Sequence, residues 1–69
     1  MTKARKRMTP EQRKNEILQA AILLAEAEGI ESLTRDEVAS EADCAVGLVS
    51  HYFNPFEKLL IEVQEFLDE

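Results

Sequence analysis

The stretch that decides the fold is TRDEVASEADCAVGLVSHYF, residues 34–53. Thr34 is a good helix N-cap, and Glu37 stands at the position that completes a capping box. Apolar residues then recur at helical spacing in two short runs, which predict helices over residues 35–42 and 46–52. A three-residue turn separates the two runs. Two short helices joined in this way are typical of a helix-turn-helix, whose second helix can enter a DNA major groove.

A longer helix is expected to brace this pair from the N-terminal side. Thr9 and Gln12 form a second capping-box pattern around Pro10, and Gly29 is suited to end the helix, so residues 10–28 are predicted to be helical. The apolar stripe of this helix is expected to comprise Ile17, Ala20, Ala21, Leu24 and Ala27, broadened by Leu18, Leu23 and Ala25.

A fourth helix is expected from Phe56 to the C-terminus, after the break at Asn54-Pro55. Its apolar residues follow the i, i+3, i+4, i+7 pattern: Phe56, Leu59, Leu60, Val63, Phe66 and Leu67. The predicted fold class is therefore all-α, with a three-helix, homeodomain-like helix-turn-helix core and a fourth C-terminal helix. Residues 1–8 are expected to be a flexible basic arm, and residues 9–69 the helix-turn-helix domain.

Charge is distributed very unevenly along the 69 residues, whose net charge is −6. Residues 1–14 contain six Lys and Arg residues and one Glu, a net charge of +5. The remainder contains two basic residues and thirteen acids, a net charge of −11. The sequence therefore predicts a basic arm on an acidic body.

Several functional classes are disfavoured by composition. The single cysteine, Cys44, and the single histidine, His51, leave no metal-ligand set and no nucleophile–base pair, so neither an enzyme nor a cofactor is expected. Cys44 is interpreted as a small buried residue of the turn rather than as a redox sensor. No apolar run is long enough for a membrane span, and a cytoplasmic location is the simplest expectation.

A series of motifs extends along most of the chain: Ile17-Leu18-Gln19-Ala20-Ala21, Gly29-Ile30, Thr34, Val38-Ala39, Gly47, Tyr52-Phe53 and Glu57-Lys58-Leu59-Leu60. Together they resemble the DNA-binding domain of TetR-family repressors. The resemblance covers roughly residues 13–66. Residues 47–53 look like the variant found in betaine-operon-type members. The resemblance implies operator binding as a dimer, whereas nothing in the chain corresponds to the family's ligand-sensing and dimerising helices.

The resemblance also implies roles for particular residues. Thr34 would cap its helix near a phosphate, Gly47 would let the recognition helix approach the duplex, and Tyr52 would lie near the DNA backbone. Phe53 would anchor that helix in the core. The chain departs from the family pattern at four positions that should face DNA, namely Asp43 for a turn glycine, Ala45 for a serine, Ser50 for a tyrosine and Phe56 for a lysine.

The first functional hypothesis is a DNA-binding transcriptional regulator with residues 46–52 in the major groove and the basic arm on phosphates or in a minor groove. Because residues 46–52 lack Arg, Lys, Asn and Gln, bidentate base recognition is unavailable and specificity should be modest. Two copies could pair through the helix that starts at Phe56. The predicted DNA-binding residues are Lys3, Arg5, Lys6, Arg7, Thr34, Gly47, Leu48, Ser50, His51 and Tyr52.

The alternative hypothesis is a protein-interaction module, or a small antagonist, on a helix-turn-helix scaffold with weak or no DNA binding. It depends on Val46, Leu48 and Phe56, which would form an apolar patch for a protein partner if they were exposed together. The acidic body and the lost phosphate ligands also favour it. Bland interpretations remain beside both hypotheses: the arm as a solubilising tail and His51 as a surface histidine.

Overall fold

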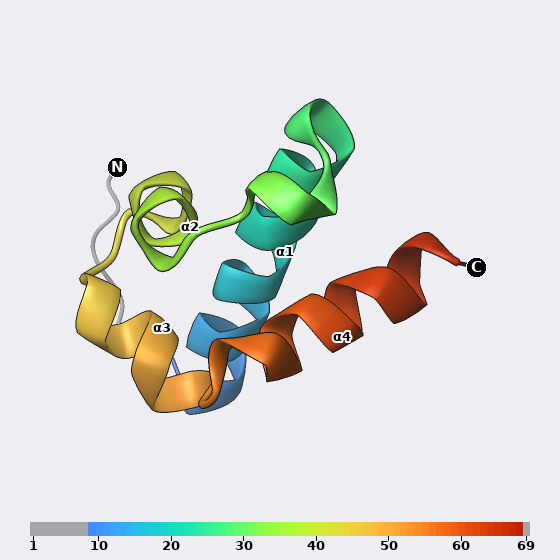
Figure 1. Cartoon of the computed structure of the whole chain (residues 1–69). Coiled ribbons are helices and arrows are strands. Elements are labelled where there is room, and N and C mark those ends of the chain that lie inside the picture. Colours follow the sequence, from blue (N-terminus) through green and yellow to red (C-terminus); the bar gives the residue numbers. More distant parts are fainter. Residues whose placement is uncertain (1–8, 69) are drawn as a thin grey trace, which may run out of the picture.

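The computed structural model describes residues 9–68, which form four α-helices and one short 3₁₀ helix (Figure 1). The elements are α1 (Pro10–Glu28), η1 (Ile30–Ser32), α2 (Arg35–Ala42), α3 (Val46–Tyr52) and α4 (Phe56–Leu67). The all-α fold with a helix-turn-helix core and a fourth helix is thereby confirmed. The bounds of the first three α-helices are those predicted from the caps and apolar spacing.

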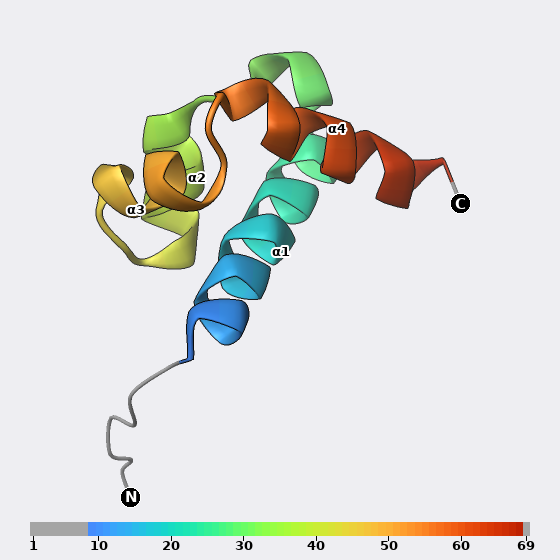
Figure 2. The same cartoon turned by 90° about the horizontal axis from the view of Figure 1, so that it is seen from below.

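The longest helix, α1, runs along the middle of the molecule and contacts α2, η1 and α4 (Figure 2). Its start is fixed by a complete capping box, in which the Thr9 hydroxyl accepts from the Gln12 amide and the Gln12 side chain accepts from the Thr9 amide, both at 3.1 Å. It ends at Gly29, whose φ of 96° would strain any other residue. Both ends of α1 thus follow from local sequence.

The core lies where α1 meets the other helices. Its buried apolar residues are Ile17, Ala20, Ala21, Ile22, Ala25, Leu33, Val38, Ala39, Ala42, Val49, Phe53, Leu59 and Val63. The prediction for α1 was wrong at Leu23 and Ala27, which are exposed, and it omitted Ile22, which is buried. Because α1 has several neighbours, its buried arc is wider than a single stripe and is rotated from the one that spacing suggested.

The last helix carries an apolar stripe that is longer than the body it covers. Leu59 and Val63 are fully buried against the core, but Phe66 and Leu67 are 50% and 40% exposed. All four residues lie along one side of α4, because their spacings are those of a helical face. The C-terminal part of α4 projects beyond the other helices (Figures 1 and 2), so the body ends before the stripe does.

Candidate nucleic-acid interface

The segment Val46–Tyr52 is a helix with one side in the core and the other side free, as the sequence predicted. Val49 and Phe53, the latter directly after the helix, are buried and anchor α3. On the opposite side Gly47 and His51, four residues apart, are exposed, and Val46 at the start of the helix is also exposed. A single helix with one free side is the element that fits a major groove, which is about 12 Å wide.

The turn between α2 and α3 is tight and sets the direction of α3. Asp43 adopts the left-handed conformation, with φ 59° and ψ 50°, and its amide donates to the Ser40 carbonyl at 3.2 Å. The Cys44 amide closes the turn on the Ala39 carbonyl at 3.0 Å. Aspartate tolerates this conformation better than most residues, which explains how the turn forms without the glycine expected from the resemblance.

The polar residues predicted to contact DNA lie at two places. Ser50, His51 and Tyr52 are all on α3, where the His51 and Tyr52 rings meet edge to face at 4.8 Å between centroids. Thr34 lies at the start of α2, where its hydroxyl accepts from the Glu37 amide at 3.1 Å. Only this half of the predicted capping box is present among the hydrogen bonds of residues 9–68, in contrast to the complete box of α1.

Gly47 is exposed on α3, and a Cβ added to it would meet nothing within 4 Å. Packing inside the chain therefore does not explain a glycine here, although glycine weakens a helix by about 1 kcal/mol relative to alanine. The backbone of α3 at Gly47 is therefore open to approach from outside.

The apolar patch predicted for a protein partner is wrong. Val46 is 40% exposed, but Leu48 and Phe56 are partly buried and pack against the core. The three residues therefore do not form a shared exposed surface. Leu48 is also poorly placed for the base contact predicted for it, because the core takes up part of its side chain.

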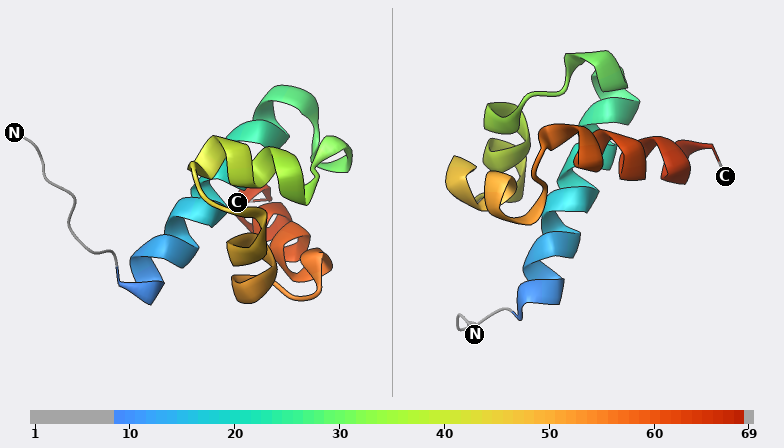
Figure 3. Two further views of the ribbon diagram at one scale, coloured as in Figure 1. Left: turned by 90° about the vertical axis from the view of Figure 1, so that its left-hand side faces the viewer. Right: turned by 60° about the horizontal axis from the view of Figure 1, so that its bottom comes forward.

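Two cations of α1 border α3 on one side. The Lys14 ammonium lies 5.4 Å from the centre of the Phe53 ring, so its side chain covers the anchor of α3. Arg13 lies near the turn, as its effect on Cys44 shows: burial raises the pKa of that thiol, and the Arg13 charge opposes the rise. Figure 3 (left) looks onto α3 and shows the start of α1 on one side of it and the start of α4 on the other.

A further cation, Arg35 of α2, lies against the start of α4, on the other side of α3 from Arg13 and Lys14. The Arg35 guanidinium carbon lies 5.2 Å from the centre of the Phe56 ring, across the first residues of α2 and α4. Arg35 was not among the residues predicted to contact DNA. The two residues are far apart in the chain and no local spacing connects them, so only the tertiary fold, which brings the first residues of α2 and α4 together, could show the contact.

The predicted arm residues lie outside the described residues: Lys3, Arg5, Lys6 and Arg7. They are joined through Thr9 to the end of α1 that borders α3. Between residues 9 and 68, no group of three His, Cys, Asp or Glu side chains could hold a metal ion. Nor is any helix in that range long and apolar enough to cross a bilayer.

Comparison with known proteins decides the family. The family model described as bacterial regulatory proteins, tetR family, matches residues 17–63, from the first turns of α1 well into α4. The chain belongs to the TetR family. This TetR-family domain is accordingly a DNA-binding regulatory domain of helix-turn-helix type, a class that is not enzymatic and typically dimerises. No curated protein and no solved structure matches the chain.

Proposed function

We propose that this TetR-family domain acts in the cytoplasm as a transcriptional repressor that places α3 in the major groove of operator DNA. The observation that carries the proposal is the outer side of α3, where Gly47 has open space around it and His51 is exposed one turn later. A duplex can approach the backbone closely at Gly47. Ser50, His51 and Tyr52 then supply hydrogen-bond donors and acceptors for bases or phosphates.

Charge supports the same orientation. Residues 9–68 contain thirteen acids against Arg13, Lys14, Arg35 and Lys58, so DNA would be repelled from most of the body. Arg13 and Lys14 border α3, and the arm residues Lys3 to Arg7 are joined to the same end of α1. Cations beside the recognition helix attract phosphates where the helix enters the groove. Each phosphate contact makes the slope of log K against log salt concentration more negative by about 0.9.

Base recognition by α3 is limited to single contacts, because α3 has no Arg, Lys, Asn or Gln for a bidentate pair. His51 and Ser50 can each make one hydrogen bond, and Val46 can contact a thymine methyl group. We therefore expect binding that depends strongly on salt and only modestly on sequence.

The test is a fluorescence-anisotropy titration of duplex DNA with the wild type and with Gly47→Leu. A Cβ at position 47 meets nothing within 4 Å, and leucine has a higher helix propensity than glycine, so the variant should unfold at the same temperature or higher. Its bulk should nevertheless weaken DNA binding at least tenfold by holding α3 away from the groove. Absence of wild-type binding at low salt, or equal binding by the variant, would overturn the proposal.

The proposed dimer contact is the exposed end of the α4 stripe. Phe66 and Leu67 continue the line of Leu59 and Val63 past the edge of the body, and a second copy of α4 could cover them. Two paired copies would present two α3 helices to half-sites spaced about one helical turn apart, roughly 34 Å. Each copy would then need only modest affinity of its own.

Sedimentation measurements of Phe66→Asp against the wild type test this contact. Phe66 is half exposed in one chain, so the variant should keep the stability of the fold. It should, however, sediment as a monomer at concentrations where the wild type is dimeric. A wild type that remains monomeric at high concentration, or a variant that still pairs, would exclude the end of α4 as the interface.

A further inference from the structure

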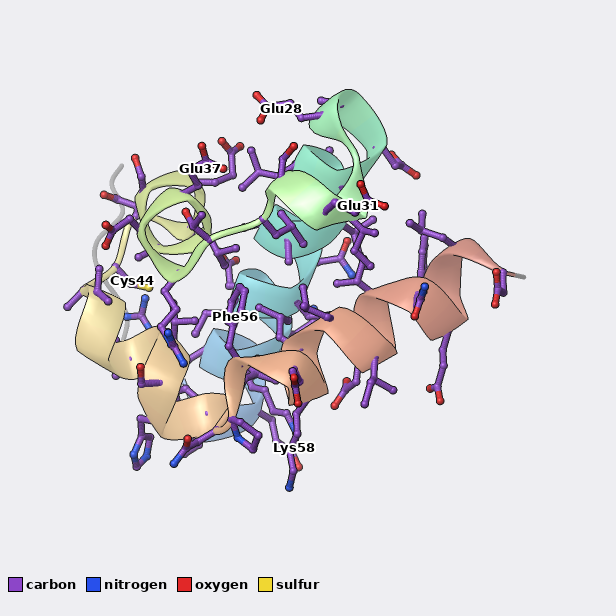
Figure 4. All side chains as sticks on the ribbon, in the orientation of Figure 1. Glu28, Glu31, Glu37, Cys44, Phe56 and Lys58 are labelled. Carbon is purple, nitrogen blue, oxygen red and sulfur yellow. The ribbon has the colours of Figure 1, made fainter. Side chains whose placement is uncertain are left out.

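Arg35 and Phe56 are in contact, and neither residue has a part in the DNA binding proposed above. Arg35 is the first residue of α2 and Phe56 the first of α4, and the guanidinium carbon is 5.2 Å from the ring centre. Phe56 points from the start of α4 toward α2 (Figure 4), with its ring partly buried against the core. Arg35 itself is exposed. The partly buried ring therefore contacts the guanidinium end of an exposed side chain.

The contact lies beside α3, opposite the cations of α1. In the view onto α3, the start of α4 is on the side away from the start of α1 (Figure 3, left). Arg35 is held at that position through Phe56, whereas Lys14 lies at the Phe53 anchor on the α1 side. A helix in a major groove has a phosphate backbone on each side, and a cation at both borders matches that arrangement.

The chemistry of the contact leaves Arg35 ready for an anion. A cation–π contact uses the charge of the guanidinium and the face of the ring, and it consumes none of the five N–H donors. Those donors form a planar fork that matches two phosphate oxygens. Contact with the ring also restricts the rotamers of a long side chain before DNA binds, which reduces the entropy lost on binding.

We propose that Arg35, positioned by the Phe56 ring, contacts a DNA phosphate on the α4 side of α3. The proposal rests on the proposed function, because it requires α3 to lie in the groove. It assigns Arg35 as a binding residue and Phe56 as the residue that positions it. The described cations then border α3 on both sides, Arg13 and Lys14 on one and Arg35 on the other.

The test compares the salt dependence of duplex binding for the wild type, Arg35→Gln, Arg35→Lys and Phe56→Leu. Loss of one phosphate contact in Arg35→Gln should make the negative slope of log K against log salt shallower by about 0.9. At 0.1 M salt this corresponds to binding that is about eightfold weaker. Arg35→Lys keeps the charge and should keep the slope. Phe56→Leu keeps an apolar side chain in place of the ring, and should weaken binding about threefold without changing the slope.

The control is Glu28→Gln, a single-charge change at the end of α1 far from α3 (Figure 4). Screening over that distance should leave affinity within about twofold of the wild type. If the wild type binds and Arg35→Gln keeps the full slope, the phosphate contact is wrong while the proposed function stands. If Phe56→Leu binds like the wild type, the positioning role is wrong. If the wild type fails to bind duplex DNA, both proposals fall together.

Discussion

The first and third helices of this domain are built on opposite principles. α1 has 19 residues, a complete capping box at Thr9 and a glycine stop at Gly29. α3 has seven residues, no side-chain cap at Ala45 and a glycine, Gly47, in its interior. Isolated helices shorter than about 12–15 residues are marginal even with good sequences. The helical conformation of α1 is therefore specified mostly by its local sequence, whereas that of α3 depends on packing against neighbouring helices.

This contrast shows which helix leaves residues exposed instead of using them to stabilise itself. α3 fixes itself to the core through Val49 and the adjoining Phe53, and leaves Val46, Gly47 and His51 free. If more residues of α3 formed caps or packed into the core, fewer would be exposed for contact with a binding partner. Because few buried residues anchor α3, substitutions at those residues should have large effects on the free energy of unfolding.

The largest expected effect comes from removing the anchor of α3. Phe53 is 1% exposed, and Phe→Ala changes in cores cost about 3–5 kcal/mol. A domain of this size has little stability to lose, so Phe53→Ala should be largely unfolded by circular dichroism at 25 °C. His51→Ala, on the free side of the same helix, should have a free energy of unfolding within about 0.5 kcal/mol of the wild type. Similar losses for both variants would contradict the division of α3 into two sides.

Caps give the next largest effect and test the contrast directly. Ala45 already has the extended backbone of an N-cap, with φ −74° and ψ 147°, but lacks a side-chain acceptor. Ala45→Ser should therefore raise the free energy of unfolding by about 1 kcal/mol, measured by urea denaturation. Thr34→Ala removes the bond to the Glu37 amide and should lower it by a similar amount. No gain in Ala45→Ser would show that α3 is already limited by tertiary packing alone.

A smaller effect is expected at the turn before α3. Asp43 has a positive φ of 59° and places a negative charge at the C-terminal end of α2, where the helix dipole disfavours it. Asp43→Gly relieves both, partly offset by the greater freedom of glycine in the unfolded chain, and should stabilise the fold by about 0.5 kcal/mol. Asp43→Ala should be less stable than Asp43→Gly, because alanine keeps the steric cost of the left-handed conformation. The reverse order would mean that the Asp43 backbone is not strained.

The smallest effect concerns Cys44, which packs partly against the core beside the same turn. Burial raises the pKa of this thiol, so the folded state favours the neutral form. That contribution to stability is complete below the ordinary thiol pKa of about 8.5 and is lost as pH rises through the raised value. Urea denaturation at pH 7 and pH 9.5 should show a small fall that Cys44→Ala abolishes. An equal fall in both proteins would assign it to other groups.

Most of the secondary structure could be predicted because its signals are local. Thr9, Gln12 and Gly29 fix α1 through contacts within a few residues, and Thr34 fixes the start of α2 in the same way. The exposed side of α3 could be predicted for the same reason, since it follows once Val49 and Phe53 are assigned to the core. That this side contacts DNA stays a prediction. The arm residues, the arm–domain division at residue 8 and the betaine-operon likeness stay predictions.

The errors share a physical cause, which is that burial depends on neighbours from elsewhere in the chain. Leu48 and Phe56 look like free apolar residues in sequence, yet both pack against the core. Leu23 continues the apolar pattern of α1, yet no other helix covers it and it is 57% exposed. Helical spacing gives the direction of each side chain around its own helix, but not which directions the other helices cover.

Local sequence was enough to predict the four α-helices, the limits of the first three, and the opposite charges of arm and body. Helix limits are local because hydrogen bonds between residues three or four apart decide them. Three features could be seen only in the folded molecule: Arg35 contacts the Phe56 ring, Lys14 covers Phe53, and the apolar stripe of α4 extends beyond the body. Those facts depend on how helices distant in the chain cross one another. Their crossing is set by the packing of the whole core, which no short stretch of residues specifies.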